Sequence, residues 1–158
     1  MDQKFSERRK AVTLEPDIHT FRTDRPGIRK ALGDLEAEIM EAIWARPISQ
    51  GTTVRDIFEI LSIRRHLAYT TVMNTMTRLA KKQLLRVEKK EQSYLYYPTY
   101  TRQEFVSRFV SHILEDLFLS FSGEMLESIQ ALQDPVAATQ ARHFLDEIRQ
   151  QRGSEEDE

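Results

Sequence analysis

The chain has 158 residues, of which 40% are hydrophobic and 30% are charged, and its formal net charge is −2. This length fits one ordinary domain, or one small domain with an oligomerisation arm. No apolar run is long enough to cross a bilayer, and the charged N-terminus lacks the apolar core of a secretory signal. The chain has no cysteine, which excludes disulfides, thiolate metal sites and cysteine nucleophiles. We therefore expect a cytoplasmic protein with no membrane segment.

The small net charge hides an uneven distribution of charge. Residues 55–90 contain nine lysines and arginines against three acids, whereas residues 115–158 contain three arginines against eleven acids. A nearly neutral protein with one strongly basic segment can bind a polyanion through that segment. Charge runs are also often no more than solvated faces, so the position of the basic segment in the fold decides its meaning.

The first 31 residues show no sustained hydrophobic periodicity. Pro16, Pro26 and Gly27 interrupt this stretch, and eight lysines and arginines stand against five acids. We predict a flexible basic arm over residues 1–31.

Three amphipathic helices are predicted next. The first begins near Asp34 and is ended by Pro47, the second covers residues 54–62, and the third covers about 68–82. Thr53 and Asp56 are spaced as a capping box at the start of the second helix.

The third helix presents two different faces. Val72, Met76 and Leu79 recur at the helical period and form an inner seam, while the opposite face carries short polar side chains flanked by cations. After this helix, aliphatic and aromatic residues alternate with polar ones around Leu85–Val87 and Tyr94–Tyr96, which predicts two strands. Because no Asn-Gly or Asp-Gly pair joins them, we expect a loop of more than two residues.

From Thr101 onward the chain is predicted to be helical. Thr101 and Glu104 form a capping box, Ser122 and Gly123 mark a break, and Asp134-Pro135 begins a last helix. The wide apolar stripes exceed what one small domain can hide, so we expect a homodimer rather than an intramolecular cap on the first domain. The residues expected at this interface are Phe105, Phe109, Ile113, Leu117, Phe118, Phe121, Met125, Ile129, Phe144 and Ile148.

Three helices followed by a two-stranded ribbon are typical of a winged helix-turn-helix. The major groove of DNA, about 12 Å wide, admits one helix, and short polar side chains let that helix approach the base edges. Thr70, Thr71 and Asn74 suit this role, although such a face is also often simply solvated. The side chains expected to contact phosphates, without reading sequence, are Arg64, Arg65, Tyr69, Arg78, Lys81, Lys82, Lys89 and Lys90.

Three segments of the chain resemble the penicillinase repressor (BlaI/MecI/CopY) family of winged-helix transcriptional regulators. They are LGDLEAEIMEAIW (32–44), LAYTTVMNTMTRLAKKQLL (67–85) and YLYYPTYTRQEF (94–105). The resemblance covers about residues 32–148. It implies a winged-helix DNA-binding domain, a helical dimerisation domain, a palindromic operator and repression of nearby genes. Carried over by position, the base-reading residues are Thr70, Thr71, Met73 and Asn74.

The chain lacks the residues on which two induction mechanisms of this family depend. Members that are induced by proteolysis carry an Asn-Phe pair where this chain has Ala131-Leu132, and copper-responsive members carry a C-terminal cysteine motif that is absent here. The inducing signal is therefore open, and an unidentified sensor or protease is a possible partner.

The complete expectation is a mainly α protein with a small β wing. It comprises an arm (1–31), a winged-helix DNA-binding domain (32–100), a helical dimerisation domain (101–150) and a disordered acidic tail (151–158). We expect no enzyme activity, no cofactor and no metal site, because the glycines are scattered and the histidines show no ligand spacing. His112 and Glu115 are one turn apart and could share a metal, but a solvated pair is more common. The alternative function is a protein-interaction module that does not bind specific DNA sequences.

Overall fold

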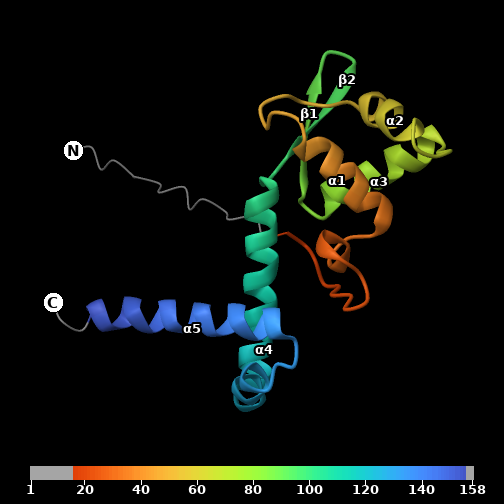
Figure 1. The fold of residues 1–158 in the computed structure, drawn as a ribbon. Coiled ribbons are helices and arrows are strands. Elements are labelled where there is room, and N and C mark those ends of the chain that lie inside the picture. The colour runs from red at the N-terminus through yellow and green to blue at the C-terminus, as the bar shows by residue number, and fades with distance from the viewer. Residues whose placement is uncertain (1–15, 156–158) are drawn as a thin grey trace, which may run out of the picture. The chain divides into compact units, whose positions relative to one another are not determined.

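The computed structural model describes residues 16–155, apart from the side chains of Leu126, Leu145 and residues 148–155. The chain divides into two units, Met1–Phe109 and Val110–Glu158. The first unit contains the helices α1 (Asp34–Trp44), α2 (Val54–Ser62) and α3 (Tyr69–Lys81) and the strands β1 (Leu85–Lys90) and β2 (Ser93–Pro98) (Figure 1). Three helices and a hairpin make this unit a winged helix-turn-helix, as the sequence predicted. Within the described residues, no helix is both long and apolar enough to span a membrane.

The three helices of the first unit form where apolar residues recur at the helical period, and α2 also has a side-chain cap. The Thr53 hydroxyl accepts from the Asp56 amide at 3.2 Å, and the Asp56 carboxylate accepts from the Thr53 amide at 2.8 Å. This confirms the predicted capping box of α2. The helices enclose one apolar core, in which Ile39, Ile57 and Met76 are all fully buried.

Strands β1 and β2 form the wing. They pair antiparallel from Leu85 opposite Pro98 to Lys90 opposite Ser93, so only Glu91 and Gln92 remain in the turn. The expectation of a longer loop was wrong. Glu91 adopts a φ of 55°, the left-handed region that glycine usually fills, and a two-residue turn therefore closes without glycine. Thr52 adds a bridge to Tyr96, which ties the wing to the segment before α2.

Residues 16–31 pack onto the winged helix instead of forming part of a flexible arm. A short 3-10 helix, Gly27–Lys30, buries Ile28, and the amide of Asp17 donates to the carbonyl of Lys82 at 3.0 Å. The ring of Phe21 lies 6.0 Å from that of Phe109. The sequence prediction missed this packing because its apolar anchors follow no helical or strand period. Residues 1–15 of the predicted arm lie outside the described residues.

The first two turns of helix α4 (Arg102–Gln130) belong to the winged-helix unit. The Trp44 indole N–H donates to the Tyr100 carbonyl at 2.9 Å, and Arg102 pairs with Glu41 at 3.1 Å. Phe105 is completely buried beside Trp44, with 5.4 Å between the ring centroids. The two units therefore divide at Val110 rather than at Thr101, where the sequence placed the boundary.

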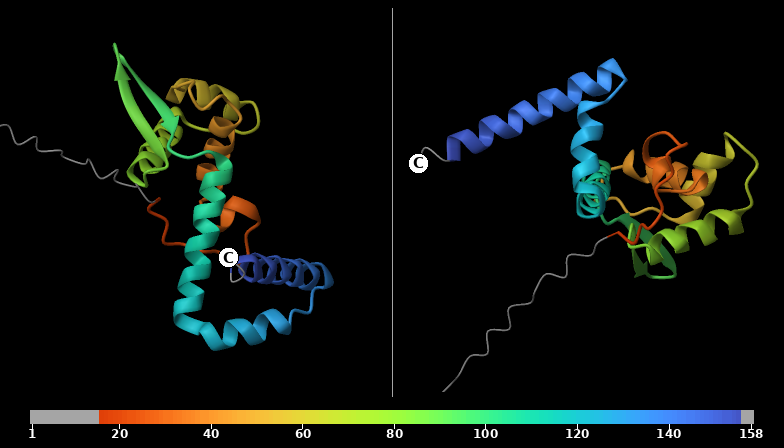
Figure 2. Two further views of the ribbon diagram at one scale, coloured as in Figure 1. Left: turned by 90° about the vertical axis from the view of Figure 1, so that its left-hand side faces the viewer. Right: turned by 90° about the horizontal axis from the view of Figure 1, so that it is seen from below.

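The second unit consists of the rest of α4 and helix α5 (Pro135–Glu155). Phe121 has non-helical angles (φ −140°, ψ 44°), and α4 changes direction there (Figure 2), close to the break predicted at Ser122. The Asp134 carboxylate accepts from the amides of Val136 and Ala137 and so caps α5 as predicted. Helix α5 continues to Glu155, beyond the residue 151 at which a disordered tail was expected, since Gly153 alone does not end it. Residues 156–158 lie outside the described residues.

Candidate nucleic-acid interface

Helix α3 has one face in the core and one face open to solvent. The predicted seam of Val72, Met76 and Leu79 is completely buried. Thr75 is also buried, and its hydroxyl donates to the Thr71 carbonyl at 2.8 Å, which satisfies the buried oxygen within the helix. The rotation of α3 about its axis is thus fixed by packing, and this decides which side chains remain exposed.

The exposed face carries the four residues that were expected to read bases. Thr70, Thr71 and Asn74 are exposed, and Met73 is 38% exposed. Thr77, which the sequence analysis did not single out, is exposed four residues after Met73, to whose carbonyl its hydroxyl donates at 2.9 Å. Helical spacing from Met73 and Asn74 is the signal that would have identified it.

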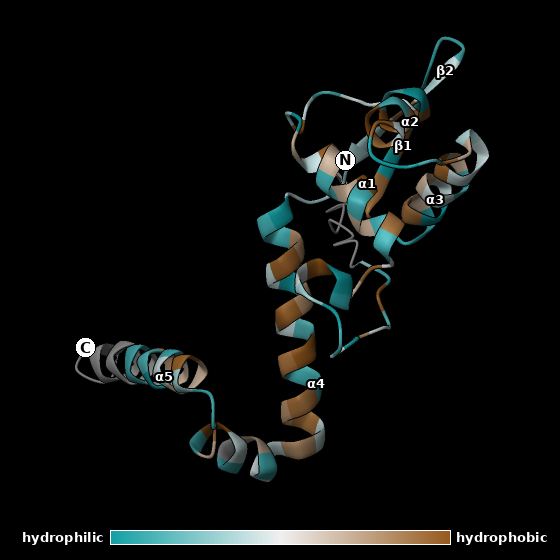
Figure 3. Cartoon of the chain, turned by 45° about the vertical axis from the view of Figure 1, so that its right-hand side comes forward, coloured by the Kyte–Doolittle hydropathy of each residue, from teal (hydrophilic) through white to brown (hydrophobic). Residues whose placement is uncertain are grey.

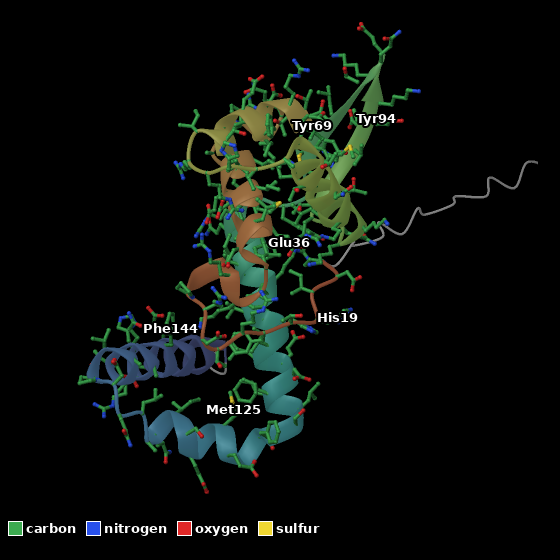
Figure 4. The ribbon with its side chains drawn as sticks, turned by 90° about the vertical axis from the view of Figure 1, so that its right-hand side faces the viewer. His19, Glu36, Tyr69, Tyr94, Met125 and Phe144 are labelled. Atoms are coloured by element: carbon green, nitrogen blue, oxygen red, sulfur yellow. The ribbon has the colours of Figure 1, made fainter. Side chains whose placement is uncertain are left out.

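Tyr69 begins α3 at the edge of this face (Figure 4). Its ring packs edge-on against Phe58 of α2, with 5.6 Å between the centroids, yet the residue remains 44% exposed. The aromatic contact thus holds the Tyr69 ring at the start of α3 while part of the side chain stays open to solvent.

Most of the cations that were expected to contact phosphates are exposed. Arg64 and Arg65 lie in the turn between α2 and α3, and Arg65 is 3.6 Å from the carboxylate of Glu38. Arg78 and Lys81 occupy the last turn of α3. Because these side chains are solvated, their ion pairs within the protein are weak.

The wing carries a second set of exposed cations. Lys89 and Lys90 end β1, with Tyr94 and Ser93 as their partners on β2. Tyr94 is 56% exposed on the hairpin (Figure 4). Arg86, which the sequence analysis left out of the site, stacks 5.7 Å over the Tyr97 ring and lies 3.6 Å from Glu88. The hairpin thus presents both charge and aromatic surface.

Lys82 differs from the other cations because it makes close hydrogen bonds to both oxygens of a buried carboxylate. Its Nζ lies 2.8 and 3.0 Å from the two carboxylate oxygens of Glu36, whose side chain is 8% exposed. Burial raises the pKa of Glu36, but the hydrogen bonds from Lys82 and from the Gly33 amide, with the charge of Arg78, outweigh it and hold the pKa below 4.5. Lys82 therefore has a partner inside the protein, and we leave it out of the proposed phosphate contacts.

The residues expected at the subunit interface fall into two groups. Phe105 is buried in the core of the first unit and Phe109 packs on Phe21 and Phe105, so a place for Phe105 at an interface does not fit its burial. The remaining residues lie on the second unit, where apolar residues recur along α4 (Figure 3). Of these, Ile113, Leu117, Met125 and Ile129 are half-buried, while Phe118, Phe121 and Phe144 are at least half exposed. The side chain of Ile148 lies outside the described residues.

Several exposed apolar residues of the second unit were not singled out from the sequence. Leu119 is 88% exposed and Val136 is 65% exposed, and Leu114 is also exposed. Leu119 directly follows Phe118, so two adjacent large side chains are open to solvent on α4. Within the described part of the chain, no group of three potential metal ligands lies together.

These features define a winged-helix protein with an open, polar third helix, a basic wing and a separate helical unit rich in exposed apolar residues. Residues 32–151 match the model of the penicillinase repressor family, and the chain belongs to this family.

A curated relative supports this assignment over about half of the chain. The transcriptional regulator BlaI of Mycobacterium tuberculosis is 46% identical over 76 residues, in both strain CDC 1551 / Oshkosh and strain ATCC 25618 / H37Rv. The match covers 48% of this chain and 54% of the relative, so the chain spans about half the length of the curated relatives it matches.

Among solved structures, the DNA-binding domain of the repressor BlaI is 22% identical, with a TM-score of 0.42 over 52% of this chain and 95% of that one. MepR, a transcription regulator of the Staphylococcus aureus multidrug efflux pump MepA, is also 22% identical, with a TM-score of 0.39 over 62% of this chain and 72% of that one.

Proposed function

We propose that this protein is a sequence-specific transcriptional repressor that binds double-stranded DNA as a homodimer. The observation that carries the proposal is the open face of α3, where Thr70, Thr71, Met73 and Asn74 are exposed while the opposite seam is buried in the core. Asn74 can pair with the N6 and N7 positions of adenine, and threonine methyl groups can contact the thymine methyl. Membership of a repressor family favours a regulator over an enzyme, and we infer that it acts in the cytoplasm.

Phosphate contacts would position this helix in the major groove. Exposed cations lie in the turn before α3, in its last turn and on the wing. We infer that these side chains bind the DNA backbone and supply most of the affinity without reading sequence. The proposed phosphate contacts are Arg64, Arg65, Tyr69, Arg78, Lys81, Lys89 and Lys90.

The exposed apolar residues of the second unit support self-association. Leu119, Val136 and Phe144 are each more than 60% exposed, and a neighbouring copy would remove their surface from water. A two-fold dimer would present two α3 helices to one duplex. We therefore infer a palindromic operator whose half-sites are about one helical turn apart, or a multiple of that distance.

The test is binding of the purified full-length chain to a random-sequence duplex library, followed by sequencing of the bound DNA. We expect a palindromic sequence to be enriched, with an affinity that falls with a log–log salt slope of roughly −0.9 for each phosphate contacted. No binding to any duplex at low salt would contradict the proposal and favour a protein-interaction module.

Two substitutions separate base reading from phosphate binding. Asn74→Ala should lower the discrimination at one base pair of each half-site by about 1–3 kcal/mol. Lys89→Ala should weaken binding to all duplexes alike and reduce the salt slope by about 0.9. Gln103→Ala, which removes an exposed amide from α4, is the matched control and should change neither quantity. If Asn74→Ala and Lys89→Ala had the same effect, these assigned roles would be wrong.

A further inference from the structure

The C-terminal end of α3 is held by residues that are distant in the sequence. Lys82, the residue that caps this end, directs its Nζ to Glu36, 46 positions earlier in the chain, at 2.8 Å. Its backbone carbonyl accepts from the amide of Asp17 at 3.0 Å. The last turn of α3 is therefore held from two sides, through a side chain by α1 and through the backbone by the segment that precedes α1.

Glu36 is well placed to be the fixed partner of this contact. It lies in the first turn of α1, where its Oε2 accepts from the Gly33 amide at 3.0 Å, and the whole residue is 6% exposed. The guanidinium of Arg78, one turn before Lys82, lies 3.9 Å from the same carboxylate. A carboxylate that is already anchored to its own helix gives the cations of α3 a fixed target.

The end of α3 is also closed by its own backbone. The amide of Leu84 donates to the Leu79 carbonyl at 3.0 Å, and the amide of Gln83 donates to the Ala80 carbonyl at 3.0 Å. This is a Schellman motif, with Gln83 at a φ of 62° and Leu84 buried. The helix end is thus well defined, so a contact made there can fix the direction of the entire helix.

A partly buried ion pair adds little stability compared with apolar packing, but its short contacts require one side-chain geometry. We propose that Glu36 is a positioning residue for DNA reading, which acts through Lys82 to fix the angle at which α3 presents its polar face. The inference rests on the proposed function, because it assigns a role within DNA recognition. It differs from a direct phosphate contact by Lys82, which would need the ammonium to leave Glu36.

The experiment compares Glu36→Gln, Lys82→Met and the double variant in the full-length chain. The probes are a duplex selected by the wild-type protein from a random library and a mixed-sequence duplex of equal length. We expect each single variant to weaken binding to the selected duplex by about tenfold and the double variant to be no weaker than the worse single variant. Affinity for the mixed-sequence duplex and the salt slope should both stay near the wild-type values.

Glu41→Gln is the matched control, since it removes a carboxylate of the same helix that pairs with Arg102 of α4 instead of with α3. It should bind both duplexes like the wild type. All binding is measured at a temperature at which circular dichroism shows each variant folded. If Lys82→Met does not fold, Lys82→Gln replaces it, because it also removes the charge that pairs with Glu36 but keeps a polar end group at this half-exposed position.

Two outcomes would overturn the inference while leaving the proposed function intact. If Lys82→Met reduced the salt slope by about 0.9 and Glu36→Gln had no effect, Lys82 would be a phosphate contact. If all variants bound the selected duplex like the wild type, the ion pair would have no part in recognition. Failure of the wild type to bind any duplex would instead contradict the proposed function itself.

Discussion

The winged-helix unit and the helical unit differ in how far they bury their apolar side chains. In the first unit, α1, α2, α3 and the start of α4 enclose completely buried residues such as Ile39, Met76 and Phe105. In the second unit, Phe118, Leu119 and Phe144 are at least half exposed, and none of the described residues there is buried. The first unit therefore buries its core residues within a single chain. The second unit leaves large apolar side chains exposed, which is why we propose that a second copy of the chain covers them.

The largest expected difference in stability is between the alanine variants of two phenylalanines, one from each unit. Phe105→Ala should lower the free energy of unfolding by about 3–5 kcal/mol, because it leaves a cavity in a fully packed core. Phe118→Ala, at a position that is 50% exposed, should change the stability of the single chain by no more than about 0.5 kcal/mol. Urea denaturation at a low protein concentration measures both values. Equal losses for the two variants would mean that the contrast in burial is not real.

The proposed part of the exposed apolar residues in self-association can be tested by introducing a charged side chain. Leu119 is 88% exposed, so Leu119→Asp should leave the single chain folded but weaken self-association by about ten- to a hundredfold, as expected for the loss of one buried leucine from an interface. Sedimentation equilibrium measures this change. Glu115→Ala, at an exposed charged position of the same helix, is the control. Unchanged association of Leu119→Asp would remove this part of α4 from the interface.

The ion pair between Glu36 of α1 and Lys82 at the end of α3 predicts that the stability of the first unit depends on pH. Because the pKa of Glu36 is lower in the folded protein than its ordinary value of 4.5, its carboxylate stabilises the fold above that pH and loses the effect as the pH falls. Glu36→Gln should therefore be less stable than the wild type at neutral pH, and the difference should shrink below pH 4.5. Urea midpoints across this range measure the difference. A gap that stayed constant with pH would contradict the lowered pKa.

The smallest expected change in stability concerns Gln83, which follows α3 and has a left-handed backbone conformation. Gln83 has a φ of 62°, which costs a side chain about 1 kcal/mol that glycine avoids. Gln83→Gly should therefore stabilise the first unit by about that amount in thermal unfolding. Lys81→Gly, at the last residue of α3, should instead destabilise it, by at most about 1 kcal/mol. A loss of stability in Gln83→Gly would show that its side chain makes contacts that matter more than the backbone strain.

Local sequence patterns predicted the helices and strands of the first unit well. The second helix was predicted over 54–62 and is seen at Val54–Ser62, because Thr53 fixes its start and an apolar face fixes its period. The third was predicted over about 68–82 and is seen at Tyr69–Lys81. The same periodicity separated its buried seam from its exposed face. These features depend on neighbours within one or two helical turns, which a single sequence records.

Contacts between distant residues were not predicted. Nothing near Lys82 indicates that its partner is Glu36, and the apolar stripe of α4 does not reveal that Phe105 belongs to the core of the first unit. The packing of residues 16–31 was missed for the same reason. In each case the pattern shows that a side chain needs a partner, while only the tertiary structure identifies that partner.

Trp44 is the only tryptophan of the chain, and its indole N–H is bonded to the Tyr100 carbonyl within the winged-helix unit. Its fluorescence therefore reports on that unit alone. Circular dichroism, by contrast, includes the helices of the second unit as well. If the two signals changed at different urea concentrations, the two units would unfold independently, and if they coincided, the chain would unfold as one cooperative system. The native protein thus already contains a probe that can separate the folding of its two units without any added label.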